Sequence, residues 1–436
     1  MSVMSVLHPQ LMNKGPMLCE WYCQKLSGIG FPIYSSFDIR DSGFKIAPVD
    51  GNIYPAGFNN ICPTDKESSV DILKTYLDKH YGSQIERILL VTEEHTQNPY
   101  YWDNISTLTR LLEDGGRRVL VAFPRKLDQK IDLMSASGYQ ISVVSGDLES
   151  SPVKDFKPQL ILSNNDFTHD YSEWAVQVQT YQLPINPPRE LGWYQRKKSR
   201  FFDHYNALAT EFAGLVGIDE SILRVETKLF PQFDINSQES RVKLSQEVEK
   251  FIHDLRLKYK TLGWTAEPFV FVKNNSGTYG LGVMKVSNPE EILKWSYKDR
   301  KKMKAAKGGR DIEELIIQEG IPSVVESGGA AAEPVIYMIG KELAGGFLRT
   351  HHEKDSTESL NSPGAVYKRL CVSDLLVDAN PCMLENVYGW VAKLGLLAMA
   401  LEGKAMNLEY HAFRTQSELD GRGSGSHRAA CLPQEL

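Results

Sequence analysis

The 436-residue sequence contains no apolar run near the roughly 20 residues that a membrane-spanning helix needs. Residues 1–14 have no apolar segment of signal-peptide length after a basic start, so we expect a cytoplasmic protein that does not enter a membrane. The net charge of −6 provides no basic excess to neutralise phosphates, which argues against a nucleic-acid partner. The six cysteines include no Cys-x-x-Cys pair, so neither a zinc site nor a disulfide framework is indicated.

The most informative stretch present is 269–286, which has the pattern strand, lysine, glycine-rich loop, strand. No helical pattern follows the last glycine, so the segment is predicted to be a hairpin and not the strand-to-helix turn of a P-loop. Lys273 would place a cation beside phosphates, and glycines let backbone N–H groups approach them. The loop residues expected at the phosphates are Asn275, Ser276, Gly277, Thr278, Gly280 and Gly282. The pattern therefore predicts a nucleoside triphosphate under a hairpin lid.

Residues 66–166 alternate between helical and strand patterns. Strands are predicted at 87–92, 118–123 and 158–163, and helices at 69–81, 102–113 and 127–137. Such alternation indicates a parallel α/β layer. The layer carries no dinucleotide fingerprint, so no NAD site is predicted in it.

Downstream of the hairpin, the apolar strand 313–321 ends in a polar hinge, and strands at 333–339 and 343–349 follow. This order resembles the ATP-grasp superfamily, in which a first lysine, a lysine-plus-glycine lid, an Ile-Gln-Glu hinge and an arginine strand with an Asn/Gly loop come in sequence. The resemblance covers roughly the last half of the chain. It implies that the nucleotide is ATP.

The resemblance also implies roles for single residues. Lys198 would be the first lysine, with Lys197 as the alternative, and Arg349 would act with Lys273 in catalysis. The residues implied to contact ATP from the hinge are Gln318, Glu319 and Ile321. Asn361, in the loop 360–365, would contact the substrate.

The family usually ends in an acidic residue and a Glu-x-Asn pair, which are hard oxygen ligands suited to Mg²⁺. No Glu-x-Asn follows the predicted helix 384–401. The segment 407–409 has this spacing in reverse order, so Asn407 and Glu409 are the predicted magnesium ligands. Glu333 and Glu319 are the alternatives.

Residues 35–60 are dense in charged and amide groups and have neither helical nor strand periodicity. The segment is similar to the opening of a proteobacterial glutamate–cysteine ligase family seen in acidophilic iron oxidisers. Under that resemblance, carboxylates pair with Arg40 and Lys45, and an ammonium or amide is received by Asn52, Asn59 and Asn60. Arg189 could hold another carboxylate. The alternative is a well hydrogen-bonded loop without a ligand.

The predicted fold class is α/β, with an N-terminal parallel α/β domain (1–185) followed by an α+β ATP-grasp domain. Within the latter we expect a helix-rich first subdomain at 186–264 and a lid-bearing second one at 265–419. The Gly/Ser-rich tail 420–436 is expected to be disordered.

The resemblance implies a glutamate–cysteine ligase that uses ATP and Mg²⁺, with an acyl phosphate as intermediate, in the first step of glutathione synthesis. Attack by a carboxylate on a polyphosphate needs cations at both groups, and Lys198, Lys273 and Arg349 would supply them. The alternatives are another ATP-grasp amino-acid or peptide ligase of glutathione-synthetase type, or a nucleotide-binding regulatory protein without turnover. Whether the chain forms a homo-oligomer stays open.

Overall fold

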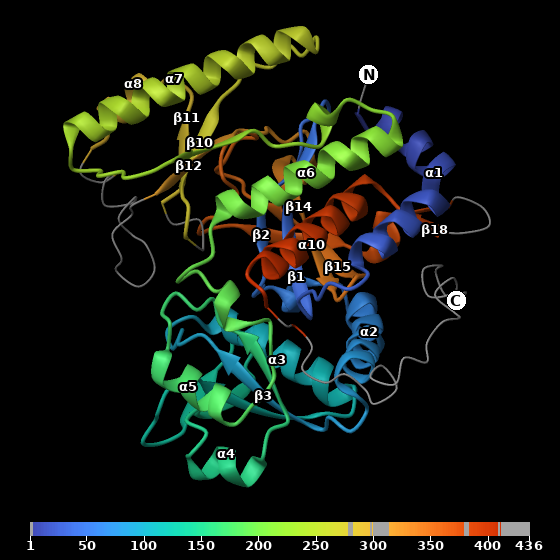
Figure 1. Ribbon diagram of the computed structural model, residues 1–436, viewed down its shortest axis with the longest axis vertical. Coiled ribbons are helices and arrows are strands. Elements are labelled where there is room, and N and C mark those ends of the chain that lie inside the picture. The colour runs from blue at the N-terminus through green and yellow to red at the C-terminus, as the bar shows by residue number, and fades with distance from the viewer. Residues whose placement is uncertain are drawn as a thin grey trace.

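The computed structural model describes residues 3–277, 282–296, 299, 314–378, 383–408 and 410. Three layers follow one another in space: a parallel α/β layer, a central sheet covered by helices, and a small sheet beneath one long helix (Figure 1). The predicted tail 420–436 lies outside the described residues. Within the described part, no helix is both long and apolar enough to cross a membrane.

The first layer is the expected parallel sheet, with strand order β5-β6-β4-β3-β7-β8. Its strands are β3 (Arg87–Thr92), β4 (Arg118–Phe123), β5 (Ile131–Met134), β6 (Gln140–Ser145), β7 (Leu160–Asn164) and β8 (Ile185–Asn186). Its helices are α2 (Pro63–Tyr81), α3 (Pro99–Asp114), α4 (Ser151–Phe156) and α5 (Ser172–Thr180). The helix predicted at 127–137 is wrong, since β5 runs antiparallel to β6 there. Half-buried Ile131 and Leu133 alternate with exposed neighbours, which is the period of a strand.

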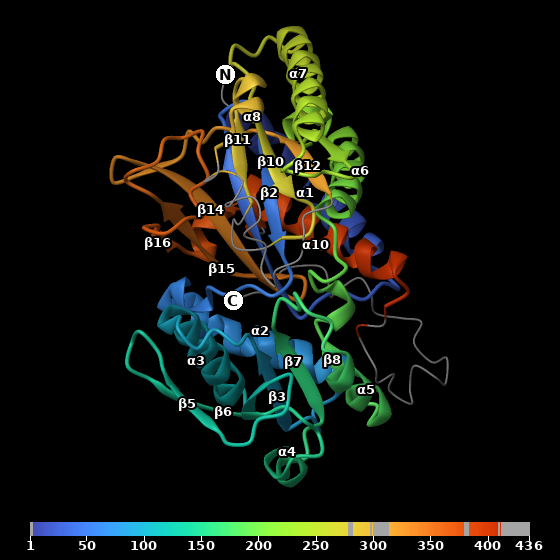
Figure 2. The same cartoon turned by 90° about the vertical axis from the view of Figure 1, so that its left-hand side faces the viewer.

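The central sheet joins the two ends of the chain, in the order β16-β15-β14-β1-β2 (Figure 2). Its strands are β1 (Tyr34–Asp41), β2 (Ile46–Asn52), β14 (Ala330–Ile339), β15 (Glu342–Thr350) and β16 (Val366–Leu370), and β13 (Glu326–Ser327) pairs with β14. The register between β1 and β14 runs from Tyr34 opposite Ile339 to Asp38 opposite Val335. The sheet pairing therefore differs from the predicted division at residue 185, because the first hairpin is part of the C-terminal sheet.

Three helices cover one face of the central sheet: α1 (Val3–Leu26), α6 (Lys198–Val216) and α10 (Val387–Ala405) (Figure 1). The N-terminus of α10 is capped by Asn386, whose side chain accepts from the backbone N–H of Tyr388 and Gly389. Gly395 lets α10 approach β1, because a Cβ atom there would stand 2.4 Å from the ring of Phe37. On the opposite face, α2 packs against part of β14 and β15.

The third layer is an antiparallel sheet in the order β11-β10-β12-β9. It consists of β9 (Thr227–Phe230), β10 (Val270–Asn274), β11 (Met284–Val286) and β12 (Leu315–Glu319), beside α7 (Gln238–Thr261) and α8 (Glu290–Leu293). The predicted hairpin is confirmed by the antiparallel pairing of β10 with β11. Val272 and Ile317 pack in the core beneath α7. Phe271 and Lys273 alternate with them and point to the other face.

The remaining elements are short connections. They are η1 (Phe58–Asn60), η2 (Arg189–Leu191), η3 (Glu220–Ile222), η4 (Val372–Leu375), β17 (Leu376–Asp378) and β18 (Met383–Glu385). The cysteines depart from the expectation in one respect, because Cys23 is disulfide-bonded. Cys62 and Cys371, 309 positions apart, also lie side by side. Because these two cysteines are so far apart in the sequence, no short motif such as Cys-x-x-Cys marks them as a pair.

The close approach at Gly395 predicts that Gly395→Ala lowers the melting temperature. Overpacking typically costs about 1–3 kcal/mol, which outweighs the ~1 kcal/mol that alanine gains over glycine in a helix. Gly214→Ala is the matched control, because that helical glycine has no atom within 4 Å of a Cβ position. We expect Gly214→Ala to melt at or above the wild-type temperature. Equal melting of the two variants would show that α10 does not depend on the contact with Phe37.

Candidate functional site

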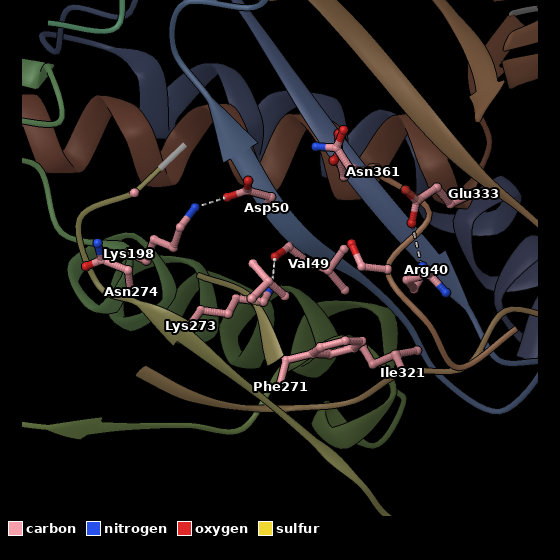
Figure 3. Close-up of a pocket in the computed structure, with 14 residues that line it drawn as sticks. Arg40, Val49, Asp50, Lys198, Phe271, Lys273, Asn274, Ile321, Glu333 and Asn361 are labelled. Atoms are coloured by element: carbon pink, nitrogen blue, oxygen red, sulfur yellow. Dashed lines mark hydrogen bonds and ion pairs between the residues drawn. The ribbon is translucent and has the colours of Figure 1, made fainter. Parts of the chain in front are cut away.

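A pocket lies between the small sheet and the open face of the central sheet (Figure 3). The small sheet contributes Phe271 and Lys273, and the central sheet contributes Asp38, Asp50 and Glu333. The pocket is also lined by Arg40, Val49, Lys198, Asn274, Gly277, Val283, Ile321, Ser359 and Asn361. Segments separated by more than 300 residues in the chain thus form one charged cleft.

The start of α6 separates the two candidate lysines. Lys198 lines the pocket and its Nζ lies 2.6 Å from Asp50 Oδ1. Lys197 is the extended residue just before the helix, and its Nζ lies 2.7 Å from Glu314, with about a third of its side chain exposed. The change from extended to helical backbone turns the two side chains apart. Of the two lysines, Lys198 is the one that faces the pocket.

Lys273 enters the pocket from β10, as the strand–lysine pattern predicted. Its Nζ donates to the carbonyl oxygen of Val49 at 3.0 Å. Burial lowers the pKa of Lys273 to about 8, against the raising effect of Asp50. A bound anion would favour the charged form of this amine.

Four buried side chains form an ion-pair cluster on the central sheet. Arg349 Nη1 lies 2.7 Å from Asp38 and 2.8 Å from Glu333. Arg40 Nε lies 2.5 Å from the other oxygen of Glu333. The cross-strand pairing of Glu333 with Arg349 puts both on one face. The Nε of Arg349 is buried without a partner, so one donor of this guanidinium is unused.

The three carboxylates of the pocket differ in their acidity. Burial raises the pKa of Asp38, and Arg349 only partly opposes it. Burial by itself would also raise the pKa of Glu333 and of Asp50. Arg40 and Arg349 nevertheless hold the pKa of Glu333 below its usual value. Lys198 and Lys273 do the same for Asp50. The charges of Glu333 and Asp50 are therefore stabilised by cations that a ligand would also contact.

Asp38 and Asp50 received no role from the sequence, yet they are direct cross-strand partners in the β1–β2 hairpin. Asn52 pairs with Ser36 two residues further along the strand, which places it on the same face as Asp50. Asp50-Gly51-Asn52 has the acid-x-Asn spacing that the family resemblance places after the last helix. The signal was present in the sequence, at the opposite end of the chain. Asp38, Asp50 and Asn52 offer oxygen ligands of the kind that Mg²⁺ prefers.

Of the two predicted magnesium ligands, Asn407 lies away from the pocket. Asn407 is exposed in a left-handed turn (φ 56°) just after α10 and does not line the pocket. Glu409 lies outside the described residues. The prediction for Asn407 is thus not supported, because the last helix runs on the covered face of the sheet, away from the cleft.

The three hinge residues, two in β12 and Ile321 just after it, have different environments. Ile321 lines the pocket. Gln318 is the cross-strand partner of Phe271, and both polar atoms of its buried amide lack a partner. Glu319 is buried among protein groups, with Lys45 Nζ at 2.6 Å and the hydroxyl of Tyr259 at 2.7 Å. Lys45 and Glu319 therefore satisfy each other and are not open to a ligand.

The glycine-rich loop begins with residues that fasten it to α6. Asn275 exchanges hydrogen bonds with Ser199, and the Ser276 hydroxyl donates to the carbonyl of Arg196. Gly277 lines the pocket, and Gly282 has a positive φ of 67° that favours glycine. Thr278 and Gly280 lie outside the described residues. The described part of the loop is anchored beside Lys198.

Arg40 and Asn361 both reach the pocket, but in different ways. Arg40 donates to the carbonyl oxygens of Ser356 and Glu358 at 2.9 and 2.7 Å, in addition to its pair with Glu333. It therefore holds the loop that presents Asn361. Asn361 is half-buried at the pocket wall.

The other predicted substrate residues are not brought to this pocket. Asn59 and Asn60 lie in η1 and share a side-chain hydrogen bond of 3.2 Å. Arg189 donates to the carbonyl of Asp170, and its guanidinium stacks 5.0 Å from the ring centre of Tyr194. Most of the segment 35–60, expected to lack strand structure, instead forms the strands β1 and β2. Asn59 keeps its buried Oδ1 without a partner among the described residues.

The separation of the two lysines predicts that Lys198→Ala and Lys197→Ala differ sharply. A charge-assisted contact to a phosphate is worth about 1.5–3 kcal/mol, so Lys198→Ala should weaken ATP binding roughly 10–100-fold. Lys197→Ala removes an ion pair that is about one-third exposed, and should leave the affinity within about threefold. Titration calorimetry with a non-hydrolysable ATP analogue measures both. Equal losses would mean that α6 does not orient Lys198 toward the nucleotide.

Comparison with known proteins places this geometry in a family. The family model for glutamate-cysteine ligase matches residues 9–403. A structure from Methylobacillus flagellatus KT, assigned as a gamma-glutamylcysteine synthetase, is similar with a TM-score of 0.80 and 29% identity, over 93% of this chain and 99% of that chain. No curated protein sequence matches the chain.

A D-alanyl-alanine synthetase A from Vibrio cholerae O1 biovar eltor str. N16961 aligns with a TM-score of 0.34 and 12% identity, over 73% of this chain and 81% of that chain. That likeness is too low to carry an argument. The family match spans nearly the whole chain and includes both sheets that form the pocket. The fold is a parallel α/β domain followed by an ATP-grasp domain, and the chain belongs to the glutamate-cysteine ligase family of ATP-dependent ligases.

Proposed function

We propose that this protein joins the γ-carboxylate of glutamate to the amine of cysteine at the expense of ATP. The observation that supports this most is the pocket between two sheets, which is lined by Lys198, Lys273, Asp38 and Glu333. Arg349 forms ion pairs with both of these carboxylates. The lysines suit the phosphates of a nucleotide, and the arginine suits a carboxylate or an oxyanion. The glutamate-cysteine ligase family match supports this pair of substrates.

The reaction we infer passes through an acyl phosphate. An oxygen of the glutamate γ-carboxylate attacks the γ-phosphorus of ATP and displaces ADP, and the cysteine amine then attacks the acyl carbon and releases phosphate. Both partners of the first step are anions, so fixed cations that are already in place lower the barrier. Lys198 and Lys273 would hold the phosphates. Arg349, with an unused Nε donor, would stabilise the oxyanion of the second step.

Asp38, Asp50 and Asn52 would hold Mg²⁺ when ATP is bound. The fit rests on the donor set, since two carboxylates stand opposite each other with an amide on the same face. When bound, such a cation would supply neutralisation of the negative charge on the phosphates, and Asp38, Asp50 and Asn52 are the residues that would hold it. Lys198, paired with Asp50 at 2.6 Å, would contact the nucleotide from the start of α6.

Gln318 and Phe271 supply a site for the nucleotide base. The unpartnered amide of Gln318 offers one donor and one acceptor, which matches the edge of an adenine. Its cross-strand neighbour Phe271 lines the pocket and can contact the ring. A buried amide without partners is costly unless a ligand pairs with it.

The experiment that tests the proposal measures phosphate release with ATP, Mg²⁺, glutamate and a panel of amines. Cysteine should give the highest rate, and mass spectrometry should identify γ-glutamylcysteine. Glutamate labelled with ¹⁸O in the γ-carboxylate should pass one label to phosphate, as an acyl phosphate requires. Turnover only with γ-glutamylcysteine and glycine would favour a glutathione-synthetase-like ligase instead. ATP binding without turnover under any condition would favour a regulatory protein.

The metal assignment predicts that Asp50→Asn raises the Mg²⁺ concentration needed for half-maximal activity. Loss of a direct ligand should cost at least the roughly 10–100-fold that outer-shell changes cost. Asn407→Ala is the control, since Asn407 is exposed after α10. We expect its Mg²⁺ dependence to equal that of the wild type. If Asn407→Ala shifts the dependence and Asp50→Asn does not, the metal site belongs to the C-terminal end of the chain.

A further inference from the structure

Two cysteines outside the ATP pocket meet where the central sheet contacts the parallel layer. Cys62 is the residue before α2, and Cys371 is the residue before η4, directly after β16. Their sulfur atoms are 2.7 Å apart and both residues are buried. Neither lines the pocket, and the proposed ligase reaction uses neither.

The sulfur separation distinguishes a disulfide site from a metal site. With Asp65, the two cysteines form a group whose ligand atoms lie within 4.8 Å of one another. Two thiolates on a tetrahedral zinc stand about 3.8 Å apart, given a Zn–S distance of roughly 2.3 Å. The bonded distance in a disulfide is about 2.05 Å. The sulfurs therefore need less movement to bond to each other than to admit a zinc ion.

The surroundings make the two thiols unequal. The Nε of Arg369 lies 2.7 Å from Cys371 Sγ, which puts a positive charge beside that sulfur. Burial raises the pKa of Cys62 to about 11, and its hydrogen bond to Cys371 acts in the same direction. Asp65 is held at the junction by the backbone N–H of Val372, at 3.0 Å. A cation next to a thiol is the setting in which cysteine acts as a nucleophile.

We propose that Cys62 and Cys371 form a redox-sensitive pair that small peroxides oxidise to a disulfide. The Cys371 thiolate attacks the peroxide O–O bond, becomes a sulfenic acid and releases hydroxide, which is protonated to water. The Cys62 sulfur then attacks the sulfenic sulfur, and the hydroxyl leaves with the Cys62 proton as a second water. In sum, two thiols and one hydrogen peroxide give one disulfide and two waters.

The position of the pair selects the oxidant. Cys62 is 5% exposed and Cys371 is 2% exposed, while Arg369 above them is exposed. A molecule of the size of hydrogen peroxide can reach a sulfur that lies one side chain below the surface. A bulky disulfide such as oxidised glutathione would meet the Arg369 side chain first. Peroxide should therefore oxidise the pair faster than glutathione disulfide does.

A disulfide between Cys62 and Cys371 would link β16, at the edge of the central sheet, to α2. β16 follows the loop that carries Ser359 and Asn361 to the pocket, and η4 continues from Cys371. A cross-link between positions 309 apart restrains the unfolded chain strongly. The oxidised protein should therefore melt at a higher temperature than the reduced protein.

The test treats reduced full-length protein with hydrogen peroxide, alkylates the remaining thiols after denaturation, and maps the peptides by mass spectrometry. We expect a peptide in which Cys62 and Cys371 are joined with the loss of two hydrogens, and its disappearance after dithiothreitol. In Cys62→Ser, dimedone should trap a sulfenic acid at Cys371. In Cys371→Ser, Cys62 should remain a thiol. These variants assign the attacking and the resolving sulfur separately.

Arg369→Gln should slow cross-linking several-fold, since it removes the charge beside Cys371. Lys368→Gln is the matched control, because it removes one exposed positive charge from the adjacent position of β16. The proposal is overturned if both thiols are still fully alkylated after peroxide that oxidises free glutathione completely. It is also overturned if the purified protein retains zinc that protects both thiols and is lost with a chelator. Equal rates of cross-linking in Arg369→Gln and Lys368→Gln would show that Arg369 does not activate Cys371.

Discussion

The structure depends on a set of buried charges that the central sheet and the start of α6 bring together at one cleft. Asp38, Glu333 and Arg349 form ion pairs at 2.7 and 2.8 Å, and Lys198 meets Asp50 at 2.6 Å across the cleft. Burying charges costs several kcal/mol per ion unless partners compensate. Apolar residues of similar volume would often stabilise a fold as well or better. Retention of so many charges at one cleft is therefore best explained by a polyanionic ligand and a charged reaction.

This arrangement requires the two ends of the chain to meet. The β1–β2 hairpin supplies Asp38 and Asp50, and it pairs with β14, some 300 residues later in the sequence. The central sheet cannot be completed until the last third of the chain is present, so its folding is dominated by non-local contacts. α10 then closes the covered face, with Gly395 against Phe37. The opposite face of the sheet, which carries Asp38, Asp50 and Glu333, lines the cleft.

Local patterns predicted those parts of the site that lie on single elements. The hairpin around Lys273 was predicted because alternation of apolar residues and a glycine-rich loop are local signals, and β10 and β11 confirm it. The helix predicted at 127–137 is wrong because a short apolar run does not distinguish a helix from a strand. Residues 131–134 instead form β5, which is stabilised by pairing with β6. The choice between Lys197 and Lys198 also needed the backbone, since it depends on where α6 begins.

By itself, the sequence determined the parallel α/β layer, the lysine hairpin and the order of motifs that points to an ATP-dependent ligase, because periodicity and glycine placement act over a few residues. Only the tertiary structure decided that Asp50 lines the cleft, with Asn52 on the same face of β2, while Asn407 does not line it. It likewise buried Lys45 against Glu319 and brought Cys62 to Cys371. Each of these outcomes depends on which strands pair across the chain, and strand pairing between distant segments is set by the packing of the whole sheet.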